Sequence, residues 1–144
     1  MYPSVHTEPS KRVRMTLGDT ELGGDKTELH VSLDCDIDFQ YGEYYTLEFS
    51  HGSVVNHQWF TVPGAYGVGY RSIAYSTANR SDFVLDLKYS HGILPAGRYR
   101  LVMEFHEVSH SSGEFAKYLS KEFAFAEFYI SEPIITNPFI NSLK

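Results

Sequence analysis

The segment from Leu94 to Met103 constrains the fold of this chain more than any other. It reads Leu-Pro-Ala-Gly-Arg-Tyr-Arg and continues directly into the apolar run Leu-Val-Met. A Pro-x-Gly turn that leads into a strand with an early tyrosine is typical of the last strand pair in a two-sheet β-sandwich. In that setting the tyrosine hydroxyl bonds to upstream backbone. We therefore predict that Tyr99 is a buried corner residue with a structural role.

Strand signals recur on both sides of this turn, because apolar and polar residues alternate with a period of two between turn residues. The segments expected to be strands are Val13–Leu17, Leu29–Leu33, Tyr45–Phe49, Gln58–Val62, Tyr70–Tyr75, Phe83–Leu87, Tyr99–Phe105 and Tyr118–Ile130. None of the chain has sustained helical periodicity. The pattern predicts an all-β fold, an antiparallel β-sandwich of about 7–9 strands. A closed barrel is the alternative, since strand number alone does not separate the two.

The length of 144 residues suits a single domain. Residues 1–11 are polar and interrupted by Pro3 and Pro9, so we expect a mobile N-terminal linker. The sandwich is expected to span residues 12–130. Residues 131–144 form a tail too broken by Pro133 and Pro138 for a helix. We expect that tail to pack along the sandwich edge or to lead to a further segment.

Composition argues against several kinds of partner. The formal charge is −6 and no basic stripe is visible, so nucleic acid is not an expected partner. No run approaches the roughly 18 apolar residues that a membrane-spanning helix needs. Cys35 is the only cysteine, so the sandwich cannot contain an intramolecular disulfide.

Several short motifs, taken in order and spacing, give the chain a family resemblance. They are Tyr41-Gly42-Glu43, Leu47-Glu48, Trp59-Phe60-Thr61-Val62-Pro63, Leu94 to Arg100 and Ala126-Glu127-Phe128. Together they resemble the bacterial immunoglobulin-like domain family of exported and cell-envelope proteins, over roughly Arg12 to Ile130. The sequence departs from the family pattern in the acidic turn Asp34–Asp38 and in a long segment between Phe105 and Tyr118.

The resemblance implies an immunoglobulin-like sandwich that carries no catalytic residues and no cofactor. It also implies an extracytoplasmic location, secreted or anchored to the cell envelope, with a leader that is absent from this chain. The expected function is that of a non-catalytic module for interaction or spacing. The partner, a protein or a glycan, and the oligomeric state stay open.

Residues with metal-binding or catalytic chemistry do not form a recognisable site. Asp34, Asp36 and Asp38 have the spacing of a calcium loop, but Phe39 and Tyr45 occupy the positions where an EF-hand needs Gly and Glu. The seven histidines lack the tight spacing of zinc ligands. No Gly-x-Ser-x-Gly nucleophile motif is present. We therefore predict no metal site and no catalytic residue. A further hypothesis, a small metal-dependent or hydrolytic enzyme, would require His, Asp or Cys side chains to converge in a pocket.

Aromatic residues crowd the middle third of the chain and are the best candidates for a binding surface. Those proposed to line it are Tyr41, Tyr44, Trp59, Tyr66 and Tyr70. Solvent-facing aromatic rings bind sugars or anchor protein partners. The alternative function is therefore a carbohydrate-binding module that uses exposed aromatics between Tyr44 and Tyr75.

Overall fold

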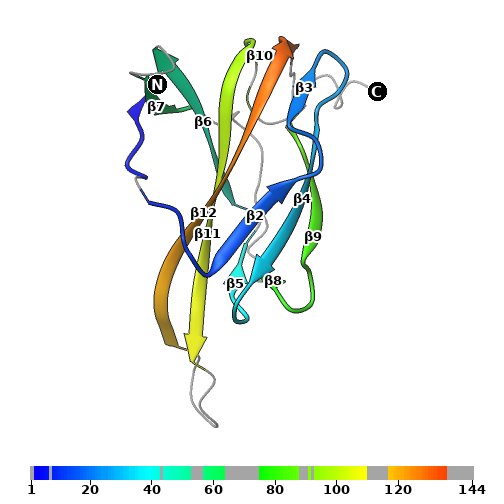
Figure 1. The fold of residues 1–144 in the computed structure, drawn as a ribbon. Helices are drawn as coiled ribbons and strands as arrows, with labels where there is room; N and C mark the ends of the chain where they lie inside the picture. The colour runs from blue at the N-terminus through cyan, green and yellow to red at the C-terminus, as the bar shows by residue number, and fades with distance from the viewer. Residues whose placement is uncertain are drawn as a thin grey trace, which may run out of the picture.

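A computed structural model of the protein describes residues 2–6, 8–42, 44–52, 57–63, 75–87, 91, 93–109 and 117–135. Strands account for all regular elements of this part of the chain (Figure 1). They are β1 (Tyr2–Pro3), β2 (Val13–Leu17), β3 (Glu21–Gly23), β4 (Glu28–Cys35), β5 (Gln40–Tyr41), β6 (Tyr45–Gly52), β7 (His57–Thr61), β8 (Tyr75–Ser76), β9 (Asp82–Asp86), β10 (Ile93–Leu94), β11 (Gly97–Ser109), β12 (Lys117–Glu132) and β13 (Ile134–Ile135).

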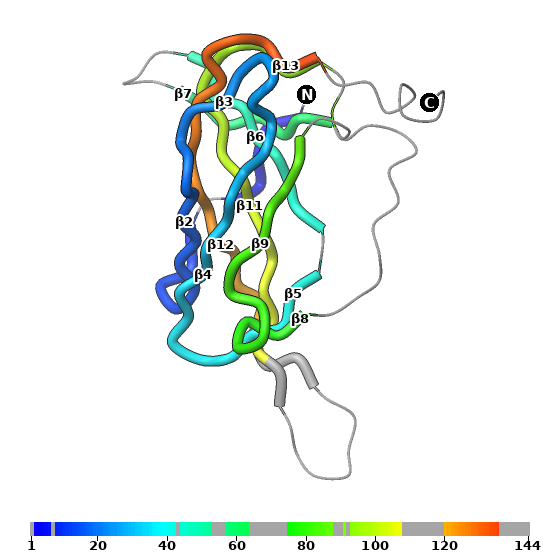
Figure 2. Tube along the Cα trace, turned by 90° about the vertical axis from the view of Figure 1, so that its right-hand side faces the viewer, coloured from blue at the N-terminus to red at the C-terminus, as the bar shows by residue number. Residues whose placement is uncertain are grey.

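The strands form two facing layers, seen from two directions in Figures 1 and 2. The large sheet has the order β1-β7-β6-β11-β12-β3, with β5 paired to β11 and β8 paired to β5. The small sheet has the order β2-β4-β9. No described strand of one sheet pairs with a strand of the other, so the fold is the predicted all-β sandwich rather than a closed barrel.

The core lies between the two inner faces and follows the period-two alternation. Along β11 the inward side chains of Tyr99, Leu101, Met103 and Phe105 are at most 1% exposed. The facing residues of the small sheet and of β12 are equally apolar: Val13, Met15, Leu29, Val31, Leu33, Phe83, Ala124, Ala126, Phe128 and Ile130. Burial of this apolar surface is the main stabilising contribution to the sandwich, which has no disulfide.

Most of the strands predicted from the sequence are present in the structure. The structure differs from the prediction in its shortest strands and in the lengths of β11 and β12. Six described strands have only two or three residues (β1, β3, β5, β8, β10 and β13), which is too short to show alternation in the sequence. In the long segment between Phe105 and Tyr118, β11 continues to Ser109 and β12 begins at Lys117, and residues 110–116 lie outside the described part of the chain. Of the predicted strand Tyr70–Tyr75, only Tyr75 lies within the described residues, in β8.

Residues 1–11 were expected to form a mobile linker, but Tyr2, Pro3, Ser4 and Ser10 are hydrogen-bonded to the large sheet. β1 pairs with β7, and the backbone amide of Ser4 donates to the carbonyl of Trp59 at 2.8 Å. The amide of Ser10 donates to the carbonyl of Phe123 at 2.7 Å. The chain then enters β2 of the small sheet, a path that Figure 1 follows from the N-terminus.

Part of the predicted tail also joins the fold. β13 pairs with β10, in the register Ile93 to Ile135 and Leu94 to Ile134. Ile134 is fully buried, whereas Ile93 and Ile135 are exposed. Residues 136–144 lie outside the described part of the chain. Among the described residues, no helix has the length and apolar character needed to cross a membrane.

Candidate functional site

Tyr99 lies in the core at the start of β11. Its hydroxyl donates to the carbonyl of Pro95 at 2.6 Å, and its ring stacks on Phe128 with centroids 5.7 Å apart. Burial raises the pKa of Tyr99 to about 12, so the phenol stays protonated and donates at neutral pH. Gly97 precedes it because a Cβ at that position would lie 2.5 Å from a ring carbon of Phe49. The contacts of Tyr99 are therefore structural ones.

The proposed aromatic surface is not a single surface. Tyr41 is only 4% exposed and packs against Tyr75, Phe83 and Phe105. Its hydroxyl donates to the carbonyl of Arg80. Tyr41 is therefore a core residue and not, as predicted, part of a binding surface. The reason is that its position on β5 faces the core. Tyr44 is 68% exposed, and Tyr66 and Tyr70 lie outside the described residues.

Trp59, the remaining member, lies on the outer face of the large sheet. The guanidinium carbons of Arg98 and Arg100 lie 5.1 and 4.6 Å from its ring centroid. Arg100 also lies 4.5 Å from the ring centroid of Phe125. Such cation–π contacts hold the two arginines flat against the sheet. Trp59 on β7 reaches β11 because the intervening residue on β6, Ser50, is small.

A buried ion pair lies beside this tryptophan. Glu48 on β6 is 0% exposed and Arg100 on β11 is 7% exposed, and their side chains form a salt bridge. Ser4 donates its hydroxyl to Glu48, while Arg100 donates to the carbonyl of His6 at 3.0 Å. The N-terminal segment thus covers two charges that would otherwise face solvent.

A groove of about 520 Å³ opens next to this cluster, at the border between the large sheet and β2. Its volume lies within the range of ligand pockets, roughly 300–1,000 Å³. The residues that line it are Pro9, Met15, Thr16, Leu17, Thr20, Trp59, Arg98, Arg100, Phe125, Ala126 and Glu127. Arg98 forms a salt bridge with Glu127, and within the part of the chain that the structure describes its buried Nε has no hydrogen-bond partner. Sequence reasoning singled out only Trp59 from this set.

The acidic turn uses its carboxylates internally. Arg14 bonds to Asp34 at 3.0 Å and to Asp36 at 2.8 Å. Asp38 accepts hydrogen bonds from Ser76, Thr77 and the amide of Ala78. Burial by itself raises the pKa of Asp38, but these hydrogen bonds outweigh it and hold the pKa below its usual value. The turn therefore joins β4 and β5 to the turn after β8.

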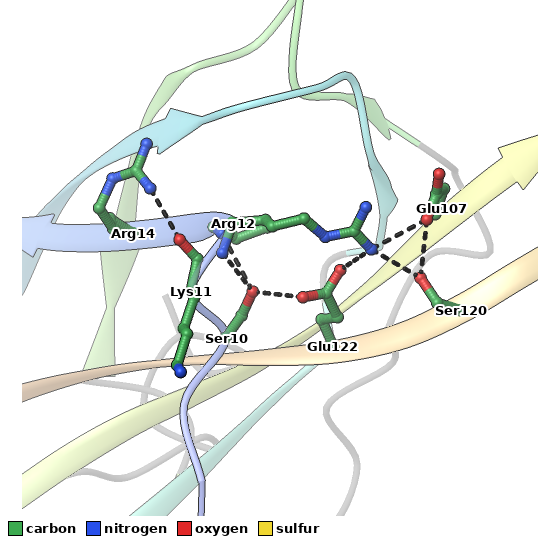
Figure 3. Close-up of polar contacts among 8 residues, drawn as sticks. Ser10, Lys11, Arg12, Arg14, Glu107, Ser120 and Glu122 are labelled. Carbon is green, nitrogen blue, oxygen red and sulfur yellow. Dashed lines mark hydrogen bonds and ion pairs between the residues drawn. The ribbon is translucent and has the colours of Figure 1, made fainter.

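A second polar cluster, drawn in Figure 3, fixes the entry into β2. Arg12 donates to Glu107 at 2.9 Å, to Ser120 at 3.1 Å and to Glu122. Ser10 donates to Glu122 at 2.6 Å and accepts from the amides of Arg12 and Val13. Hydrogen bonds from Arg12 and Ser120 lower the pKa of Glu107. These partners are about 100 positions apart, so sequence patterns do not reveal the cluster.

The histidines and the cysteine lie in separate surroundings. His91 lies between the hydroxyl of Tyr45, 3.0 Å from Nε2, and the carbonyl of Pro63, 3.2 Å from Nδ1. Burial lowers the pKa of His91 and raises that of the Cys35 thiol. Within the described ranges, no three His, Cys, Asp or Glu side chains are grouped so that they could hold a metal ion.

Comparison with known proteins gives one match. The family model described as "Bacterial Ig-like domain" matches residues 9–123. This range begins at Pro9, just before β2, and includes strands of both layers of the sandwich. No curated protein and no solved structure matches the chain.

Proposed function

This chain belongs to the bacterial Ig-like domain family, and we propose that it is a non-catalytic interaction or spacer module of an exported or envelope-anchored bacterial protein. The observation that carries the proposal is the family match over most of a two-sheet sandwich. Domains of this architecture serve many proteins as rigid building blocks, so the specific role must come from surface sites.

The chemistry of the described side chains supports a non-catalytic role. The residue types that could be reactive act in packing and turn formation. Asp38 accepts from the amide of Ala78 in the turn after β8, and the Arg12–Glu122 ion pair joins the entry of β2 to β12. His91 lies between Tyr45 and Pro63. An enzyme would instead need a nucleophile or base within hydrogen-bond reach of its partner in an accessible cleft.

The location can be tested by fractionating cells of the source organism and treating intact cells with protease. We expect the native full-length protein in the envelope or medium fraction, with loss of the immunoblot signal after protease treatment of intact cells. A cytosolic marker enzyme, which must survive the treatment, is the control. Recovery of the protein only in the cytosol would contradict the proposal.

A further inference from the structure

At the edge of β12 that faces away from β11, some backbone groups have no partner among the described residues. In the β11–β12 hairpin, the register pairs Glu104 with Phe123 and Arg98 with Tyr129. The carbonyl of Phe123 accepts from Ser10, and the amide of Tyr129 donates to Thr20, each at 2.7 Å. Because backbone polar groups alternate in direction along a strand, Phe125 and Glu127 also direct their N–H and C=O groups toward this edge.

No described residue pairs with the edge-directed groups of Phe125 and Glu127. The reason lies in the chain path: after Ser10 the chain leaves the large sheet to form β2, which pairs with β4. It returns at Thr20, where the parallel pairing of β3 with β12 begins at Tyr129. Between these two contacts the edge is open over Phe125–Glu127, about 10 Å at ~3.4 Å per residue.

The groove described above runs along this open edge. Its lining includes Phe125, Ala126 and Glu127 of β12 together with Thr16, Leu17 and Thr20 from the end of β2 and the turn after it. Trp59 and Arg98, whose side chains are in contact, also line it. The lining is mainly apolar, and the Arg98–Glu127 pair is electrically balanced. An occupant of this groove therefore needs apolar contact area together with hydrogen-bonding groups spaced like those of a strand.

Arg98 adds a further requirement for an occupant. Its Nη2 bonds to Glu127, whereas its buried Nε has no hydrogen-bond partner among the described residues. A buried donor left without an acceptor costs about 1–3 kcal/mol. An acceptor oxygen supplied by a ligand in the groove would remove that penalty.

We propose that this groove binds an extended peptide segment of a partner protein by strand addition to β12 at Phe125–Glu127. The peptide backbone pairs with the open edge, its apolar side chains lie against Trp59 and Phe125, and one of its oxygen atoms accepts from Arg98 Nε. Strand addition gives affinity through backbone hydrogen bonds and specificity through alternate side chains. The proposal rests on the interaction role proposed above and names its partner chemistry.

The experiment screens a phage-displayed library of random linear 12-residue peptides against the whole chain. Selected peptides are synthesised and titrated while the fluorescence of Trp59, the only tryptophan, reports on the groove. Amide hydrogen exchange, followed by NMR, reports on Phe125 and Glu127. We expect the selected peptides to shift the Trp59 emission and to slow exchange of both amides at least tenfold. N-methylation of alternate peptide residues should weaken binding at least tenfold.

A substitution and its matched control test the role of Arg98. Arg98→Lys keeps the charge beside Glu127 but removes the Nε donor, and should weaken binding of the selected peptides several-fold. Arg14→Lys alters an arginine paired with Asp34 and Asp36 at an exposed site, and should leave binding unchanged. Circular dichroism checks that both variants fold.

Several results would overturn the inference. They are the absence of any enriched peptide, binding that leaves exchange at Phe125 and Glu127 unchanged, and equal binding by N-methylated peptides. A shift of Trp59 emission by cellopentaose or chitopentaose, without peptide binding, would assign the groove to glycans instead. None of these results bears on the fractionation experiment, so a secreted protein that binds no peptide would retain only the spacer role.

Discussion

At the scale of single residues, the buried Glu48–Arg100 pair should contribute strongly to stability. Both side chains belong to the outer face of the large sheet, where charged residues normally stay hydrated, yet Glu48 is 0% exposed. Ser4 and His6 supply hydrogen bonds that replace part of the lost hydration. A buried ion pair is costly to break from one side, because the remaining charge stays buried and unpaired.

Arg100→Met should therefore lower the free energy of unfolding by about 3–5 kcal/mol, as measured by urea denaturation. The double variant Arg100→Met/Glu48→Leu should recover most of that loss, because it leaves no buried charge. Arg14→Met is the control: its ion pairs with Asp34 and Asp36 are exposed and should be worth at most about 1 kcal/mol. Equal effects of Arg100→Met and Arg14→Met would show that burial of the pair has no energetic weight.

At the scale of elements, the N-terminal segment is the one whose role differs most from its sequence pattern. It begins as an added strand on β7, crosses the outer face over Glu48 and Arg100, and bonds to β12 through Ser10. Arg12 then joins it to Glu107 and Glu122 (Figure 3). The segment therefore closes one side of the domain before the chain reaches the small sheet.

Deletion of residues 1–8 should destabilise the domain and expose Trp59, because Ser4 and His6 no longer cover the buried pair. We expect a lower urea midpoint and a shift of the tryptophan emission to longer wavelength. Val5→Ser is the control, since Val5 is 85% exposed and its side chain should contribute little. An unchanged midpoint in the shortened chain would mean that residues 1–8 are a linker after all.

At the scale of the whole molecule, stability should depend on pH through His91. Its ring links Tyr45 of β6 to the carbonyl of Pro63, which lies just after β7. Because the carbonyl of Pro63 can only accept, Nδ1 carries the proton and Nε2 accepts from Tyr45. Burial lowers the pKa of His91 below its ordinary value of about 6.5. The folded state therefore holds a neutral imidazole.

The sign of the effect follows from proton uptake. Below pH ~6.5 an unfolded histidine binds a proton that folded His91 does not, so the free energy of unfolding falls with falling pH. The contribution cannot exceed about 1.4 kcal/mol per pH unit and ends once pH passes the lowered folded pKa. Urea melts between pH 7.5 and 5 should show this slope flattened in His91→Gln. His30→Gln, at an exposed position on β4, is the control; a slope identical in the His91 variant would exclude this role.

The prediction of the fold from sequence succeeded where alternation is long. Val13–Leu17 and Leu29–Leu33 alternate buried and exposed residues, and the Pro-x-Gly-x-Tyr turn marks the start of β11. The candidate site was predicted only through Trp59. Tyr41 was misassigned because an aromatic residue in a strand has the same local pattern whether its face is inward or outward.

The sequence alone determined the all-β class, the strands with long alternation and the family, because these depend on local periodicity and on short motifs in order. Only the tertiary structure decided that residues 2–12 cover the large sheet and that Arg98 lies beside an open edge of β12. Those features depend on side chains and backbone groups that are distant in sequence, such as Ser4 with Glu48 and Arg12 with Glu122. Long-range packing brings them together, and no local pattern encodes which partner each group meets.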